Sequence, residues 1–195
     1  MQNYFEEKKL KDKNNPNFFI EIIKTLVIAF IIVIPIRIFI AQPFIVSGLS
    51  MDPAFKNGDY LIVDELSYRL SDPERLDVVI FRYPKQPSKF FIKRIIGLPG
   101  ETVKIEDGNV TIITIEGMSI LLDEPYVEFT KQDRYQRTLE EAEYFVLGDN
   151  RAGSSDSRIW GPLTENFIIG KPIVRLFPIT HFDFKPGSVL EPREQ

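Results

Sequence analysis

The stretch Phe44-Ile-Val-Ser-Gly-Leu-Ser-Met-Asp-Pro53 is the part of the chain from which its fold can be worked outward. Its first three residues are bulky and apolar, which is typical of a β-strand. Gly48 permits a backbone conformation that a side chain would disfavour, and Pro53 prevents the strand from continuing. Such a turn can hold one hydroxyl, of Ser47 or Ser50, at a fixed place on a surface. Serine beside glycine is more often only part of a turn, so whether either serine is catalytic depends on what other segments of the chain contain.

Composition excludes several classes of protein. The 195 residues fit one domain, or one domain with an insertion, and 44% hydrophobic residues are enough for a packed core. The net charge of −4 argues against nucleic-acid binding. The absence of cysteine excludes disulfides, thiolate catalysis and cysteine metal sites. Because His181 is the single histidine, we expect no metal and no cofactor, and a serine nucleophile would need another kind of base.

An apolar segment precedes the turn and is interrupted by few polar residues. The uncharged centre, Thr25–Ile36, is short for a membrane span and also fits a signal-peptide core or a buried helix. Lys24 and Arg37 can extend outward from the helix ends, which lengthens the usable segment to roughly 20 residues. The best processing site, Phe39-Ile40-Ala41, has a bulky residue where a small one is needed. We therefore predict an uncleaved transmembrane anchor over residues 18–42.

The charges on either side of this segment predict its orientation. Four lysines lie before it, whereas Lys56 is the next basic residue after Arg37; the four are Lys8, Lys9, Lys11 and Lys13. The positive-inside rule then places a tail of residues 1–17 in the cytoplasm and a domain of residues 43–195 outside the cytoplasmic membrane. The lipid bilayer is thus an expected partner.

The rest of the chain has a β pattern. Short runs rich in branched and aromatic residues alternate with turn residues at 59–64, 77–83, 89–96, 101–106, 109–115, 119–122, 144–147 and 168–177. Asp107-Gly108 is the strongest hairpin signal. Residues 124–143 lack periodicity and predict a loop with some helix. We expect a mainly β fold, an antiparallel barrel-like domain with a β insertion at about 101–143.

Lysine is the known substitute for histidine as the base of a serine nucleophile. Its ordinary pKa of about 10.4 must be lowered by apolar burial before it can act near neutral pH. Lys93 lies within the apolar run Phe90–Ile96 and shares a strand face with Phe91, whereas Arg94 points the other way. The alternative is an edge-strand lysine that deters aggregation.

A third segment, Gly148–Arg158, follows a strand and combines turn formers with carboxylates, hydroxyls and guanidiniums. A solvated turn or a calcium loop would have a similar composition. The arginines that alternate with the carboxylates argue against a cation site.

Together these segments resemble the type I signal peptidases, membrane-anchored Ser/Lys endopeptidases that remove signal peptides from exported preproteins. Ser47–Pro53 is similar to the nucleophile box of that family, and Lys93–Glu101 to its general-base box. Gly148–Arg158 resembles the third box, and Ile36–Phe44 resembles the lead-in. The similarity covers roughly 36–177, and three boxes in this order are specific.

The resemblance implies a role for each matching residue. Ser50 would be the acylating nucleophile, Lys93 its general base, and Ser154 a hydrogen-bond partner that orients the lysine amine. Supporting ion pairs would come from Arg94, Asp149, Asp156 and Arg158. The substrate groove and its small pockets would be lined by Phe44, Val46, Met51, Phe91 and Ile92.

Three positions depart from the family pattern. Ala152-Gly153 and Ala54-Phe55 replace more usual residue pairs, and the first would leave the third box less tightly pinned. Gly48 occupies the position at which some relatives carry an oxyanion-binding serine. The donors are then expected to be the backbone N–H groups of Ser50 and Gly48, with Ser47 facing away by strand parity.

The resulting expectation is a signal peptidase I, a serine endopeptidase that cleaves preprotein signal peptides at the outer face of the membrane. Two alternatives stay open: a dedicated processing peptidase with the same dyad, and a catalytically silent membrane-tethered β scaffold.

Overall fold

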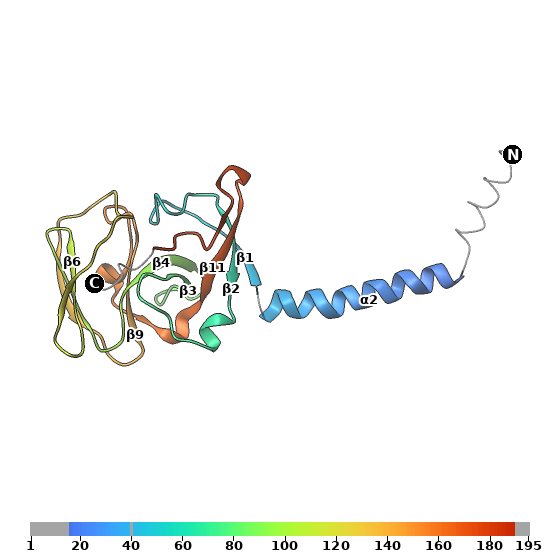
Figure 1. The fold of residues 1–195 in the computed structure, drawn as a ribbon, viewed down its shortest axis with the longest axis horizontal. Coiled ribbons are helices and arrows are strands. Elements are labelled where there is room, and N and C mark those ends of the chain that lie inside the picture. The colour runs from blue at the N-terminus through green and yellow to red at the C-terminus, as the bar shows by residue number, and fades with distance from the viewer. Residues whose placement is uncertain (1–15, 40, 190–195) are drawn as a thin grey trace, which may run out of the picture. The chain divides into compact units, whose positions relative to one another are not determined.

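The computed structural model describes residues 16–39 and 41–189, which fall into two units, Met1–Ile40 and Ala41–Gln195. Figure 1 colours the chain by residue number and labels its main elements. Most of the predicted cytoplasmic tail, residues 1–15, lies outside the described residues. So does Ile40 of the processing site considered above.

In the first unit, helix α2 (Pro16–Phe39) occupies most of the segment predicted as an anchor. The side chains from Phe18 to Val33 are all exposed, and most of them are large and apolar. The helix ends before the predicted boundary, because Ala41 and Gln42 already belong to a strand. Among the helices that the structure describes, none combines the length and the apolar character that a membrane crossing requires.

The second unit is built on an eight-stranded sheet in which every pair of neighbours is antiparallel. Its main path runs β1-β2-β11-β3-β4-β9-β10, and β12 adds to β11. The strands are β1 (Ala41–Ile45), β2 (Tyr60–Asp64), β3 (Val78–Arg82), β4 (Phe90–Gly97), β9 (Glu143–Leu147), β10 (Leu163–Thr164), β11 (Ile168–Phe177) and β12 (Asp183–Phe184). The two end strands, β1 and β10, do not pair with each other, so the sheet is open. The expectation of a barrel-like core is corrected accordingly.

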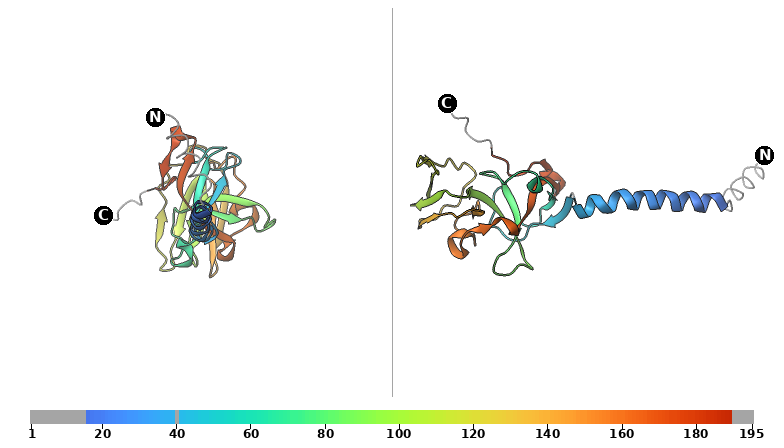
Figure 2. Two further views of the ribbon diagram at one scale, coloured as in Figure 1. Left: turned by 90° about the vertical axis from the view of Figure 1, so that its right-hand side faces the viewer. Right: turned by 90° about the horizontal axis from the view of Figure 1, so that it is seen from below.

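A smaller sheet is inserted between β4 and β9, as the sequence predicts. Its order is β7-β6-β5-β8, formed by β5 (Thr102–Glu106), β6 (Asn109–Ile113), β7 (Ser119–Leu121) and β8 (Arg134–Thr138). Figures 1 and 2 show these strands, in yellow-green, to one side of the larger sheet. Asp107 and Gly108 connect β5 to β6 with φ angles of 52° and 87°, the left-handed pair that a two-residue hairpin requires.

The expectation of a loop with some helix over residues 124–143 is wrong where β8 pairs with β5. Only Tyr135 of this strand is partly buried, and its other side chains are exposed. A strand stabilised by backbone pairing at a sheet edge has no apolar alternation for the sequence to reveal.

The cores of the two sheets explain how the turn after β1 is supported. One cluster of buried residues, which includes Val46, Met51 and Phe55, lies below the turn. A second packs the inserted sheet against Phe145 of β9, and a third fills the space around β3, β4 and β9. The helical pieces of this unit are short: α3 (Ser157–Trp160), η1 (Ser67–Arg69), η2 (Glu165–Phe167) and η3 (Ile179–His181).

Candidate active site

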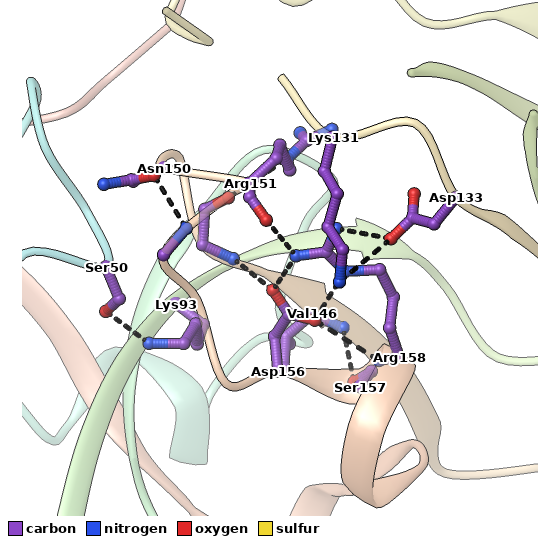
Figure 3. A network of polar contacts seen from close by, with 12 residues as sticks. Ser50, Lys93, Lys131, Asp133, Val146, Asn150, Arg151, Asp156, Ser157 and Arg158 are labelled. Atoms are coloured by element: carbon purple, nitrogen blue, oxygen red, sulfur yellow. Dashed lines mark hydrogen bonds and ion pairs between the residues drawn. The ribbon is translucent and has the colours of Figure 1, made fainter. Parts of the chain in front are cut away.

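Ser50 and Lys93 lie side by side although 43 residues separate them in sequence. The Nζ atom of Lys93 donates a hydrogen bond of 2.6 Å to Oγ of Ser50 (Figure 3). It donates another of 2.8 Å to the carbonyl oxygen of Ile92. The serine comes from the turn after β1 and the lysine from β4. The pair therefore joins a surface turn to a strand at the centre of the larger sheet.

Burial changes the acid–base properties of Lys93. The side chain is 3% exposed, and its Nζ lies 5.4 Å from the centre of the Phe91 ring. Loss of hydration disfavours the ammonium form and lowers the pKa of Lys93 to about 8, against the opposing influence of Asp156 and Asp149. A lysine in this environment is uncharged often enough to accept a proton near neutral pH.

The neighbouring residue, Arg94, points to the opposite face of β4, as strand alternation predicts. It is fully buried, and its guanidinium forms a two-pronged ion pair with Asp149 through hydrogen bonds of 2.9 and 2.6 Å. Its Nη1 also donates to the backbone carbonyls of Leu76 and Gly187, and its face stacks 4.1 Å from the ring centre of Tyr126. Arg94 thus ties the start of the third segment to the sheet.

The remaining carboxylate of the third segment is held by its own arginine. Asp156 accepts hydrogen bonds of 2.8 Å from both Nε and Nη2 of Arg158, and one from the backbone of Gly148. Burial by itself would raise the pKa of Asp156, but the guanidinium of Arg158 holds it below its ordinary value. The four residues for which the resemblance implies ion pairs therefore pair as Arg94 with Asp149 and Arg158 with Asp156. Figure 3 shows the second of these pairs.

Ser154 does not have the contact that the resemblance implies. Its hydroxyl is buried and makes no hydrogen bond to Lys93, whose amine is bound to Ser50 and Ile92 instead. It packs so closely on the Cα of Gly148 that a Cβ at that position would overlap both the Ser154 hydroxyl and the Ser50 carbonyl. Gly148, which the sequence analysis did not single out, is what lets the third segment approach the nucleophile turn.

The backbone N–H of Gly48 does not have the role that was expected of it. This N–H donates to Oδ1 of Asn57 at 2.9 Å and is thus already occupied, so its assignment as an oxyanion donor is corrected. The N–H of Ser50, by contrast, makes no hydrogen bond within residues 41–189. The argument from strand parity fails here because β1 ends at Ile45 and Gly48 has φ +98°. Ser47 borders the same cavity as Ser50.

Two asparagines that the sequence analysis did not identify hold the nucleophile turn. Asn57 binds Gly48 from one side. From the other side, the backbone N–H of Asn150 donates to the Ser50 carbonyl and its side-chain amide donates to the Leu49 carbonyl, both at 3.1 Å. In the sequence, Asn57-Gly58 is typical of a turn, and nothing in it indicates the contact with Gly48.

A cavity of about 500 Å³ opens beside the dyad, between the turn and β4. Four of the five predicted groove residues line it: Phe44, Val46, Phe91 and Ile92. Met51 does not. Its side chain is 1% exposed and packs in the core beneath the turn, because the chain reverses direction after Gly48.

In the part of the chain that the structure describes, no three His, Asp or Glu side chains are grouped as a metal site would need.

The segment after β7 adds side chains that the sequence analysis passed over as a charged loop. Glu124 forms an ion pair with Arg151, including a hydrogen bond of 2.9 Å from Nη1. Asp133 accepts a hydrogen bond of 2.9 Å from Nη1 of Arg158. The inserted sheet is therefore linked to the third segment by charged contacts at two points.

Comparison with known proteins gives one consistent family. The family model described as "Signal peptidase, peptidase S26" matches residues 19–177. A probable signal peptidase I-2 of Synechocystis sp. is 37% identical over 180 residues, which cover 89% of this chain and 80% of the relative. A signal peptidase I of Leptolyngbya laminosa is 36% identical over 166 residues, covering 80% and 79%. The crystal structure of a signal peptidase I from Enterococcus faecalis V583 aligns with a TM-score of 0.45 at 31% identity, over 52% of this chain and 97% of that one.

The left-handed backbone at Gly48 generates a stability prediction. Replacing Gly48 by serine should lower the free energy of unfolding by about 1–3 kcal/mol, because a side chain is strained at φ +98° even though the space around it is open. Urea denaturation of the solubilised protein would measure the change. Ser47→Ala is the matched control, since this exposed neighbour should change stability by no more than about 0.5 kcal/mol. Equal stability of Gly48→Ser and wild type would contradict the assigned turn geometry.

Proposed function

Since the chain belongs to the signal peptidase family, peptidase S26, we propose that Ser50 and Lys93 are the dyad with which it cleaves signal peptides. The single observation that carries this assignment is the 2.6 Å hydrogen bond between a serine hydroxyl and a lysine amine that is 3% exposed. Lysine can replace histidine as the base of a serine nucleophile only where burial lowers its pKa.

In the first half of the reaction, Lys93 in its uncharged form accepts the proton of the Ser50 hydroxyl as Oγ attacks the scissile carbonyl. The resulting ammonium then gives this proton to the departing amine of the mature protein. This leaves the signal peptide as an ester on Ser50 and returns Lys93 to its uncharged form. In the second half, Lys93 accepts a proton from water as the water oxygen attacks the ester carbonyl. The Lys93 ammonium then returns this proton to Oγ of Ser50 as the ester bond breaks, which releases the signal peptide with a free carboxyl group and restores both residues.

The negative charge on the scissile carbonyl oxygen needs a donor that is free before the reaction. The N–H of Ser50 meets this condition within the described domain, whereas the N–H of Gly48 is bound to Asn57. We assign the Ser50 N–H as the principal oxyanion donor, with Asn57 holding the turn in the conformation that directs it.

The groove beside the dyad accommodates the signal peptide in an extended conformation, bound by its backbone along the strands. Phe44, Val46, Phe91 and Ile92 form apolar walls next to Ser50. These walls leave room for small side chains at positions −1 and −3, which point to the same side of an extended peptide.

The cellular setting follows from the family and from the sequence. Signal peptidases are generally membrane-associated. For this chain we propose a single-pass arrangement, with the segment 18–42 as anchor, the N-terminus in the cytoplasm and the catalytic domain outside. The support is the lysine-rich N-terminal flank and the exposed apolar side chains of α2.

The dyad makes a prediction for activity and its pH dependence. Lys93→Met and Ser50→Ala should each reduce kcat/KM by about 10³-fold or more, and Lys93→Arg should be equally inactive because arginine stays protonated. In the wild type, kcat/KM should rise about tenfold per pH unit below the lysine pKa and level off above it. With the Lys93 pKa at about 8, the plateau should begin near that pH, since only the uncharged amine accepts a proton.

Two controls separate this role from a structural one. Lys93→Met should be no less stable than wild type, because it removes the penalty of burying an amine. Lys104→Met, at a lysine 43% exposed on β5, should keep full activity. Activity of Lys93→Met within tenfold of wild type, or a flat pH profile, would refute the mechanism.

The groove predicts substrate choice. A peptide with Ala at −1 and −3 should be cleaved, whereas Leu at either position should lower kcat/KM by about 100-fold or more, because its branched end cannot enter between the apolar walls. Leu at −2 is the matched control, since this side chain points away from the sheet and should be tolerated. Equal cleavage of the −1 Ala and −1 Leu peptides would refute the assignment of the groove.

The proposed topology is tested by protease added to sealed spheroplasts that express the full chain. The domain after Gln42 should be digested while an epitope on the N-terminal tail is spared, because only the outer side is accessible. Lysis with detergent should then expose both. Protection of the domain in intact spheroplasts would overturn the proposed orientation.

A further inference from the structure

A second cavity, of about 250 Å³, adjoins the groove described above. Phe90 borders both cavities, and its ring packs edge-on against Phe44 at 5.3 Å between centres. The remaining lining of the second cavity differs from the groove because it is largely polar. Its polar side chains include Gln42, Glu65, Arg69 and Arg82. This cavity has no part in the mechanism proposed for the dyad.

The two cavities follow one another along the strands. On β1, Phe44 lines the groove and Gln42, two residues earlier on the same strand face, lines the second cavity. On β3, Ile80 lines the groove and Arg82 the second cavity.

The step from Phe44 to Gln42 on β1 and the step from Ile80 to Arg82 on β3 lead in the same direction in space. Arg82 pairs with Phe90 in the register of β3 and β4, at the end of β4 away from Lys93. Because all neighbouring strands are antiparallel, β1 and β4 run in the same direction and β3 runs opposite to both. A peptide that leaves Ser50 along the groove therefore passes Phe90 and reaches the second cavity.

The second cavity carries an excess of positive charge. Neither Arg69 nor Arg82 forms an ion pair with any residue in the described part of the chain. The guanidinium of Arg82 lies 5.1 Å from the centre of the Phe90 ring, so it is positioned at the junction of the two cavities. Glu65 is the one carboxylate in the lining, and both arginines act on it through space. Two guanidiniums and one carboxylate leave a net charge of +1.

We propose that this second cavity is a subsite for the signal peptide, and that it favours an acidic side chain about five residues before the cleaved bond. The inference rests on the proposed function. Three residues separate Lys93 from Phe90, a distance of about 10 Å along a strand. A peptide with position −1 beside Lys93 thus has position −4 beside Phe90. Position −5 comes next and points to the same side as −1 and −3.

The experiment compares three peptides that differ only at position −5, with Glu, Ala or Lys there and Ala at −1 and −3. For the wild-type full chain in detergent, we expect kcat/KM for the Glu peptide to exceed that for the Lys peptide about five- to tenfold. In the double variant Arg69→Gln/Arg82→Gln this ratio should fall to about twofold or less. The ratio is internal to each protein, so partial misfolding scales both peptides alike.

Arg134→Gln is the matched control, because it makes the same change at an arginine 77% exposed on the inserted sheet. This variant should keep the wild-type ratio. Equal cleavage of the three peptides by the wild type, or an undiminished ratio in the double variant, would overturn the subsite while leaving the proposed function intact. Failure of the wild type to cleave the Ala peptide would instead refute the proposed function, and the subsite with it.

A second measurement tests the competing occupant, a phospholipid phosphate. Flotation with vesicles of phosphatidylglycerol and phosphatidylcholine would compare membrane binding of wild type and double variant. Equal binding by both proteins, together with loss of the Glu preference in the double variant, supports the peptide subsite. Weaker binding by the double variant with an unchanged peptide ratio would assign the two arginines to lipid and overturn the proposal.

Discussion

The burial of one lysine amine beside one serine hydroxyl is the constraint on which the rest of this structure depends. An ammonium group at 3% exposure loses most of its hydration, and this is what lowers the pKa of Lys93 to about 8. Such burial needs apolar neighbours held rigidly around the side chain. Strand β4 lies between β3 and β9 in the larger sheet and provides that setting from below. The turn that carries Ser50 covers the amine from the other side.

The ion pairs around the dyad serve the same constraint by neutralising the nearby carboxylates. Asp149 and Asp156 both act on Lys93 in the direction that raises its pKa. Each of them is already engaged by a guanidinium, Asp149 by Arg94 and Asp156 by Arg158. An unpaired carboxylate at either place would stabilise the ammonium form and make the lysine a poorer base. The pairs thus do more than hold the third segment in position, because they keep its negative charge from cancelling the effect of burial.

Strands and turns could be predicted from the sequence where their residue types mark them, as apolar runs mark buried strands and turn residues mark hairpins. Strands β2, β3, β4 and β11 of the larger sheet are rich in branched apolar residues, and Asp107-Gly108 fixes a hairpin by its two left-handed residues. Strand β8 could not be found in this way, because its stability comes from backbone pairing with β5 and not from an apolar face. The open sheet was mistaken for a barrel because closure depends on whether the end strands meet, which no local pattern records.

Within the site, the sequence was sufficient to bring Ser50 and Lys93 into one hypothesis, but it could not predict side-chain directions after Gly48. Parity arguments assume an extended strand, and β1 ends three residues before this glycine. The burial of Met51 and the hydrogen bond from Gly48 to Asn57 both follow from that break. The contact between Gly148 and the nucleophile turn joins segments about 100 residues apart, so it is a property of the tertiary structure alone.

The inserted sheet explains how the third segment stays in place despite Ala152-Gly153, the pair that was expected to leave it less tightly held. The segment after β7 contributes Glu124 to Arg151 and accepts the backbone N–H of Ala152 at the carbonyl of Phe129. The side-chain oxygen of Asn150 accepts a hydrogen bond from the N–H of Gly153, and Asn150 itself donates two hydrogen bonds to the nucleophile turn. The insertion is therefore connected, through the third segment, to the turn that carries Ser50. Replacing Glu124 or Asp133 would remove a carboxylate partner of Arg151 or Arg158, close to Asp149 and Asp156. Such a substitution would change the electrostatic surroundings of Lys93, and hence its pKa, without altering either residue of the dyad.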